Sequence, residues 1–219
     1  MPNETFFKLN KKKQELIKQA FYIEFASHSF DEASITKVVK RIEIAKGSVY
    51  QYFENKLNLF MYLLHEAGAK KVSFLEPVKR ESFSSFWDYM RQVYIAGIEF
   101  DSQCYLESHF LQSAFNNSDS PSVKLIFKKW NKSILDEFAK KVQFEIDSGL
   151  FHNHLPADKM AFILKKNLDQ INDYMLHFNG LDMEKNILSS KGIYSGNMSK
   201  KLLDSVDEHF ILLKKTFNK

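Results

Sequence analysis

The chain has 219 residues, of which 44% are apolar and 26% charged, so it can bury a real core, and no run of eighteen apolar residues suggests a membrane span. Its one cysteine, Cys104, excludes an internal disulfide and a cysteine-cluster metal site, and the N-terminus shows no signal-peptide pattern, so we expect a cytoplasmic protein. Residues 1–72 hold 12 Lys and Arg against 8 Asp and Glu, and so carry the whole net charge of +4, which indicates a basic binding module in the first third.

Helix-start signals divide the first third of the chain into four helices. Asn10, Ser34 and Asn55 are N-cap candidates, and another short helix begins near Ala45. The first helix is expected to run to about residue 27, and the one after Asn55 to about residue 76. The two helices between them are short and amphipathic.

The rest of the chain is typical of long helices with polar breaks. A break with turn chemistry covers residues 116–121, Gly149 is a helix-ending C′ residue, and residues 179–198 are expected to form a loop. With 7 Gly, 4 Pro and no strand pattern, the predicted fold class is all-α, with about nine helices in all. The expected long helices cover residues 83–100, 104–115, 122–148, 156–178 and 199–217.

Two short helices joined by a three-residue turn in a basic segment predict a helix-turn-helix. The major groove of DNA admits one helix, which a second helix must brace. Small residues for close approach stand at the start of the second helix, at Ala45, Gly47 and Ser48. Phosphate donors on it and just beyond it are Lys46, Tyr50, Tyr52 and Lys56.

Residues 34–60 resemble the DNA-binding signature of the TetR/AcrR family of bacterial repressors. The most specific part is Lys46-Gly47-Ser48-Val49-Tyr50-Gln51-Tyr52-Phe53, followed by Asn55-Lys56. The resemblance covers about residues 10–65. It implies a helix-turn-helix DNA-binding domain over 1–56, a linking helix at about 56–76, and an all-helical ligand-binding and dimerisation domain over 77–219.

The resemblance and the side-chain chemistry together suggest roles for ten residues. Lys46, Ser48 and Gln51 are candidates for base contacts, and Tyr50 for a base or phosphate contact, with Gly47 allowing close approach. The candidates for phosphate contact are Tyr52, Lys56 and Ser34, with Thr36 and Lys37 in second rank. The alternatives stay open that the lysines are solvated surface and the tyrosines pack in the core.

The turn of the motif departs from the family pattern. The family usually has small residues and a glycine there, whereas this chain has Ile42-Glu43. Since a left-handed turn residue costs a non-glycine side chain about 1 kcal/mol, we expect a slightly different turn geometry.

The family resemblance also implies a homodimer on a pseudo-palindromic operator, with the two recognition helices about 34–36 Å apart. Dimerisation through the last two long helices would use their apolar stripes, although such stripes can instead pack inside one monomer. The candidate interface residues are Phe162, Lys166, Ile171, Leu203, Val206 and Phe210.

Aromatic side chains stud the central helices, where a small apolar or aromatic effector could bind. The same spacing suits a solid core equally well. The candidate effector-binding residues are Trp87, Met90, Tyr94, Tyr105, Phe110, Phe127, Trp130 and Asn131.

The preferred function is a ligand-responsive repressor rather than an enzyme. One alternative is a DNA-binding protein that is controlled by a protein partner or has a structural role on the chromosome. Another is a helical carrier or enzyme, and the presence of Lys46, Tyr52 and Lys56 argues against it. Neither a cofactor nor a metal is expected, because phosphate-loop and catalytic motifs are missing and His152 and His154 have no clear third ligand.

Overall fold

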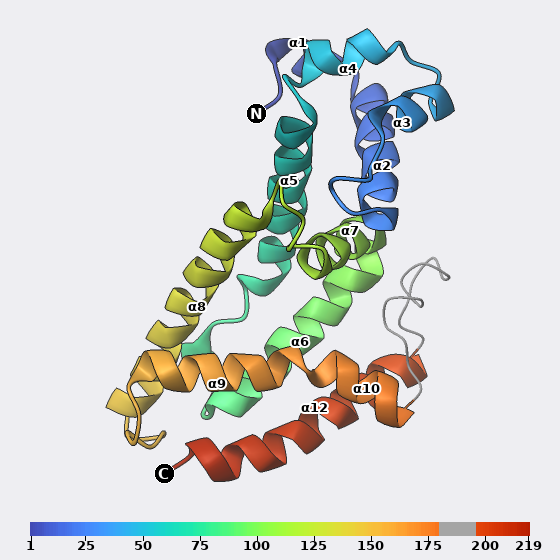
Figure 1. Cartoon of the computed structure of the whole chain (residues 1–219). Coiled ribbons are helices and arrows are strands. Elements are labelled where there is room, and N and C mark those ends of the chain that lie inside the picture. The colour runs from blue at the N-terminus through green and yellow to red at the C-terminus, as the bar shows by residue number, and fades with distance from the viewer. Residues whose placement is uncertain (180–195) are drawn as a thin grey trace. The chain divides into compact units, whose positions relative to one another are not determined.

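A computed structural model describes residues 1–179 and 196–219, and every regular element within them is a helix (Figure 1). The predicted all-α class is therefore confirmed, with one isolated bridge between Phe151 and Asn218. The expected loop over 179–198 lies almost wholly outside the described residues. The helices are α1 (Glu4–Phe7), α2 (Lys11–Ser27), α3 (Ile35–Arg41), α4 (Lys46–Tyr52), α5 (Lys56–Leu75), η1 (Arg80–Ser82), α6 (Phe86–Gln103), α7 (Tyr105–Asn116), α8 (Lys124–Asp147), α9 (Ala157–Asp169), α10 (Ile171–Asn179) and α12 (Gly196–Phe217).

The chain divides into two compact units. Unit 1 comprises Met1–Phe74 and Gln103–Leu125, and unit 2 comprises Leu75–Ser102 and Ile126–Lys219. Helix α7 packs along α2 and so belongs with the N-terminal helices. The division into two functional domains, expected at residues 56–76, stays a prediction. By its packing, unit 1 also includes Gln103–Leu125 from later in the chain.

Side-chain caps begin three helices of unit 1 where the sequence places them. The backbone N–H of Lys13 donates to the Asn10 carboxamide oxygen at 2.9 Å. The Asn55 carboxamide oxygen accepts from the N–H of Asn58 at 2.8 Å. The Ser34 hydroxyl caps α3 in the same way. Each cap satisfies an N–H that has no partner within its own helix, so these helix starts follow from local chemistry.

The core of unit 1 is a cluster of phenylalanine rings from several helices. The ring centroid of Phe60 lies 5.1 Å from that of Phe25, 5.1 Å from that of Phe30 and 5.5 Å from that of Phe110. All four side chains are buried. Phe110 of α7 thus completes the core beneath the helix-turn-helix.

Helix α1 was not expected from the sequence. Its one buried side chain, Phe6, is fully inaccessible and packs against three rings from later in the chain. The centroid distances are 5.0 Å to Phe53, 5.7 Å to Tyr62 and 6.0 Å to Tyr52. A four-residue helix is too short to show a hydrophobic period, and this tertiary packing is what holds it.

Unit 2 has its own apolar core, built by α6, α8, α9 and α12. Trp87 is only 2% exposed, and its indole N–H donates to the Asn218 side chain at 2.7 Å. Arg80 and the fully buried Glu145 form a two-point ion pair, with N–O distances of 2.5 and 2.8 Å. The Arg80 guanidinium also donates to the Phe83 carbonyl, so η1 is fastened to α8.

Two helix boundaries differ from the sequence prediction. Helix α6 begins at Phe86 rather than residue 83, because the Ser85 hydroxyl accepts from the Asp88 N–H. The single helix expected over 156–178 is wrong, since α9 ends at Asp169 and α10 begins at Ile171. The Tyr94 hydroxyl donates to the Leu168 carbonyl at 3.2 Å, and a side chain that takes a helix carbonyl interrupts the backbone ladder there.

Candidate nucleic-acid interface

The turn between α3 and α4 contains a strained residue. The Ile44 N–H donates to the Val39 carbonyl at 3.0 Å, which ends α3 in a Schellman motif with Glu43 at the C′ position. Glu43 has a φ of +56°, the left-handed conformation that favours glycine. The expectation that the turn would avoid this geometry is wrong. The chain keeps the left-handed turn and puts a glutamate in it.

Helix α4 has one face in the core and one in solvent. Val49 and Phe53 are each 1% exposed and anchor the inner face, as their spacing of four predicts. Lys46, Gly47, Tyr50 and Gln51 are exposed, and Ser48 is half-buried. A Cβ placed on Gly47 would meet no atom within 4 Å, so open space stands in front of the helix start. This outer face has the small and polar residues that a groove-reading helix needs.

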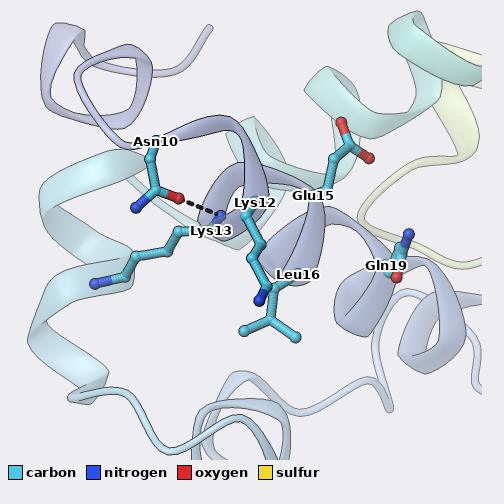
Figure 2. A pocket seen from close by; sticks show the side chains of 6 residues that line it. All are labelled: Asn10, Lys12, Lys13, Glu15, Leu16 and Gln19. Atoms are coloured by element: carbon cyan, nitrogen blue, oxygen red, sulfur yellow. Dashed lines mark hydrogen bonds between the residues drawn. The ribbon is translucent and has the colours of Figure 1, made fainter.

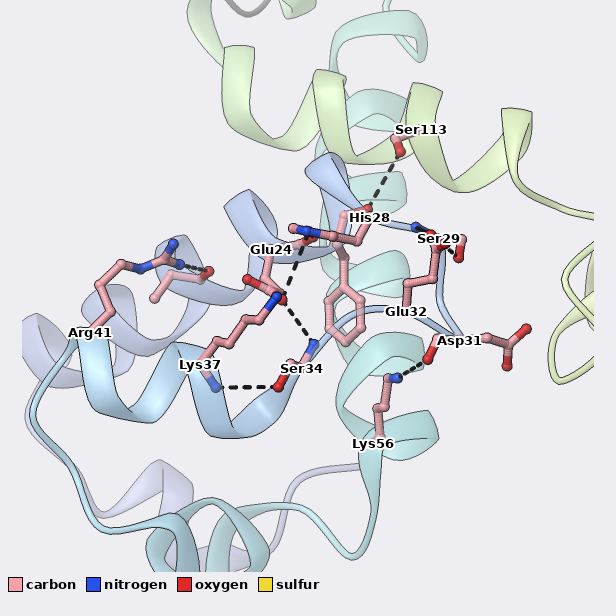
Figure 3. Close-up of polar contacts among 12 residues, drawn as sticks. Glu24, His28, Ser29, Asp31, Glu32, Ser34, Lys37, Arg41, Lys56 and Ser113 are labelled. Atoms are coloured by element: carbon pink, nitrogen blue, oxygen red, sulfur yellow. Dashed lines mark hydrogen bonds and ion pairs between the residues drawn. The ribbon is translucent and has the colours of Figure 1, made fainter.

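The start of α3 is held by a buried carboxylate (Figure 3). The Ser34 backbone N–H donates to the Glu24 carboxylate at 2.8 Å, so it has no proton to give a phosphate. The Ser34 hydroxyl accepts from the Lys37 N–H at 3.3 Å and retains its own proton for donation. Thr36 and the Lys37 side chain are exposed beside it. Of the two groups at Ser34 that could donate to a phosphate, the hydroxyl and the backbone N–H, only the hydroxyl is available.

Tyr52 and Lys56 point into unit 1 rather than away from it. Tyr52 is 7% exposed beside Phe6. The Lys56 ammonium donates to the Asp31 carbonyl at 3.2 Å (Figure 3). It also lies 4.9 Å from the centroid of the Phe30 ring. Burial lowers the pKa of Lys56. Their phosphate contacts stay predictions, and both residues serve the packing of unit 1 in this structure.

The candidate effector residues are divided between the two units. Tyr105 and Phe110 belong to unit 1, where Phe110 is part of the phenylalanine core. Trp87 and Met90 lie in the packed core of unit 2, and Tyr94 packs against that core. The remaining three lie on α8: Phe127 is buried, Trp130 half-buried and Asn131 exposed.

The candidate dimer residues are likewise mixed. Ile171, Val206 and Phe210 are buried within unit 2. Leu203 is half-buried, whereas Phe162 and Lys166 are exposed on α9. The sequence pattern did not single out two further exposed apolar residues, Ile211 and Leu212 of α12.

His152, His154 and Cys104 lie outside the helix-turn-helix. The rings of His152 and His154 stack with centroids 4.6 Å apart, and the described residues hold no group of three or more His, Cys, Asp or Glu placed to bind a metal. Cys104 is buried at the start of α7. Within residues 1–179 and 196–219, no helix is both long and apolar enough to cross a bilayer.

Comparison with known proteins identifies the helix-turn-helix. Residues 22–63 match the family model described as bacterial regulatory proteins, tetR family. Comparison with curated protein sequences gave no match. The fold and the site thus define a helix-turn-helix DNA-binding protein. The match spans α2 to α5, so this segment is similar to the DNA-binding part of the tetR family of bacterial regulatory proteins.

Solved structures share the fold along nearly the whole chain. A TetR family regulator from Chloroflexus aurantiacus J-10-FL is 22% identical, with a TM-score of 0.78 over 100% of this chain and 99% of its own. A transcriptional regulator from Aquifex aeolicus VF5 is 18% identical, with a TM-score of 0.61 over 91% and 98%. The SmeT–triclosan complex is 13% identical, with a TM-score of 0.61 over 94% and 91%.

Proposed function

We propose that this regulator is a repressor that binds a pseudo-palindromic operator as a homodimer and is released by a small apolar or aromatic effector. The outer face of α4 carries the proposal, because Lys46, Tyr50 and Gln51 stand exposed on a helix whose opposite face is buried. Lysine and glutamine are side chains that read guanine and adenine edges in the major groove. Such a protein acts in the cytoplasm, where bacterial operator DNA lies.

Exposed apolar side chains on the last helices support the homodimer. Phe162 is 51% exposed on α9, and Ile211 and Leu212 are 57% and 67% exposed on α12. Adjacent exposed apolar residues such as Ile211 and Leu212 mark a surface that a partner can cover. A second copy fits this requirement, because two recognition helices one DNA turn apart match a palindromic site.

Effector control is supported by the aromatic content of unit 2 and by the likeness to SmeT, whose structure contains triclosan, a small aromatic compound. The dense packing around Trp87 and Met90 instead favours the alternative, a DNA-binding protein with a filled core that answers to a protein partner or has a structural role on the chromosome. The two candidates differ in whether a small molecule changes DNA affinity.

DNA selection from a random duplex pool tests the proposal directly. We expect enrichment of a palindromic site and one dimer per site by light scattering. Lys46→Ala and Gln51→Ala should each reduce discrimination between the selected site and random DNA, while Lys128→Ala, an exposed lysine of unit 2, should not. A pool that shows no enrichment contradicts the assignment of α4.

Triclosan and a panel of apolar aromatic compounds then separate the two candidates. Release of the selected duplex, together with thermal stabilisation of the free protein, supports effector control. Unchanged DNA affinity and melting temperature across the panel favour the partner-controlled alternative.

A further inference from the structure

Three consecutive lysines stand at the start of α2, and none of them is among the ten candidate DNA-contact residues above. Lys11, Lys12 and Lys13 are all exposed. In the described part of the chain, none of their ammonium groups lies within ion-pair distance of a carboxylate. The nearby acids have other partners, since Glu4 pairs with Lys8 at 3.5 Å and Glu15 with Lys18. The lysine triplet is therefore an uncompensated positive patch.

Hydrogen bonds fasten the segment before this patch to the end of α4. The Asn3 backbone N–H donates to the Tyr52 carbonyl at 2.7 Å. The Asn3 carboxamide and the Thr5 hydroxyl both donate to the Gln51 carbonyl, at 3.0 and 2.6 Å. Phe6 adds its buried ring to the same place. Helix α1 is thus held against α4, and the lysines follow it by four residues.

The link from α1 to the lysines is also rigid. Gln14 is buried and its carboxamide donates to the carbonyls of Phe7 and Leu9, at 3.3 and 2.7 Å. Figure 2 shows the Asn10 cap on the Lys13 N–H, with the Lys12 and Lys13 side chains extending from the ribbon at the edge of a shallow hollow. The patch therefore has a fixed position relative to α4.

Folding alone does not account for this placement. The first turn of a helix carries the positive end of the helix dipole, where lysine is unfavourable and acidic residues are preferred. The first turn of α2 has three lysines and no acidic residue. A cation cluster that weakens its own helix is explained by a negatively charged partner outside the chain.

We propose that Lys11, Lys12 and Lys13 bind the phosphate backbone of the same DNA duplex that α4 reads, on the flank of the groove next to the end of α4. This inference rests on the proposed function and extends it. A helix in the major groove has one phosphate strand on each side, and the lysine triplet, held through α1, would bind the strand nearest the end of α4.

The experiment compares two triple variants with the wild-type chain. Lys11→Gln/Lys12→Gln/Lys13→Gln removes the patch, and Lys128→Gln/Lys129→Gln/Lys159→Gln removes the same charge from exposed lysines of unit 2. Binding to the selected duplex and to a random-sequence duplex is measured between 50 and 200 mM salt. Losing lysines at the start of α2 does not weaken that helix, so unfolding does not confound the comparison.

Each phosphate contact contributes about 0.9 to the slope of log affinity against log salt, so three contacts contribute roughly 2.7 for each protomer bound. Across a fourfold change in salt this corresponds to about 40-fold in affinity per protomer, and the two protomers of a dimer multiply the effect. We expect the patch variant to lose this salt dependence on both duplexes while its preference for the selected site is retained. If the patch variant matches the unit 2 control, the inference is wrong and the proposed function stands. If the wild-type chain itself shows no salt-dependent binding to either duplex, both fail.

Discussion

Replacing Glu43 by glycine is the sharpest test of how the helix-turn-helix is built. Glu43 is exposed, occupies the C′ position after α3 and has a φ of +56°. Glycine takes this conformation without the steric conflict that a Cβ introduces. We therefore expect Glu43→Gly to stabilise unit 1, although glycine is an unfavourable substitution at most positions.

The magnitude follows from two opposing effects. Relief of the left-handed conformation contributes about 1–2 kcal/mol. The greater freedom of glycine in the unfolded chain offsets this by about 0.4–1 kcal/mol. The expected net gain is about 0.5–1 kcal/mol, which for a unit of this size corresponds to a rise of roughly 2–8 °C in the melting temperature of the unit.

Glu43→Ala is the matched control, because it removes the same carboxylate and keeps the Cβ. Calorimetry gives the stability of each variant, and hydrogen exchange at the Ile44 amide, which donates to the Val39 carbonyl, reports on the motif itself. Glu43→Gly should exceed both the wild-type chain and Glu43→Ala. Equal stability of the glycine and alanine variants would show that the left-handed turn is not strained, and the reasoning would fail.

Three further predictions concern packing and charge. Glu145→Ala should lower the free energy of unfolding of unit 2 by about 3–5 kcal/mol, because it leaves the Arg80 guanidinium without its carboxylate. Urea denaturation followed by tryptophan fluorescence measures this loss of stability. A loss under about 1 kcal/mol contradicts the role of the ion pair. Phe6→Ala should destabilise unit 1 by about 3–5 kcal/mol and reduce amide protection in α4, whereas intact protection there would show that α1 does not support α4. Hydrogen bonds from the Ser120 and Ser122 hydroxyls hold the pKa of Asp31 below its ordinary value of 3.8. The stability that these bonds give the folded state is therefore present above pH 3.8 and is lost as the pH falls through the lower folded-state pKa. The stability difference between wild type and Asp31→Asn in acid titrations should accordingly shrink below about pH 4, and a difference independent of pH is the contrary result.

Features that depend on neighbouring residues were predictable from the sequence. The caps at Asn10, Ser34 and Asn55 each join a side chain to a backbone N–H three residues later. The buried positions of α4 also follow from spacing, since Val49 and Phe53 lie four residues apart on one face. Such contacts join residues within a short stretch of sequence, and they were sufficient to predict the all-α fold and the helix-turn-helix.

Features that depend on distant residues were not predictable. Helix α1 is held by Tyr52, Phe53 and Tyr62, far along the chain from Phe6. The helix break after α9 lies where the Tyr94 hydroxyl donates to the Leu168 carbonyl, and no pattern within α9 predicts that break. Periodicity shows that a face is apolar but does not say which apolar residues cover it. For the same reason the pattern did not show that Tyr52 packs beside Phe6, and its phosphate contact stays a prediction.

The docking of Phe6 has a consequence for the order in which the protein assembles. The first residues to be synthesised complete their contacts only after Phe53 and Tyr62 have been made, so a loop of roughly fifty residues must close first. Non-local contacts of this kind form late. The end of α4 should therefore settle later than the locally held helix starts of unit 1, and a newly made chain completes this surface only when its own beginning packs against it.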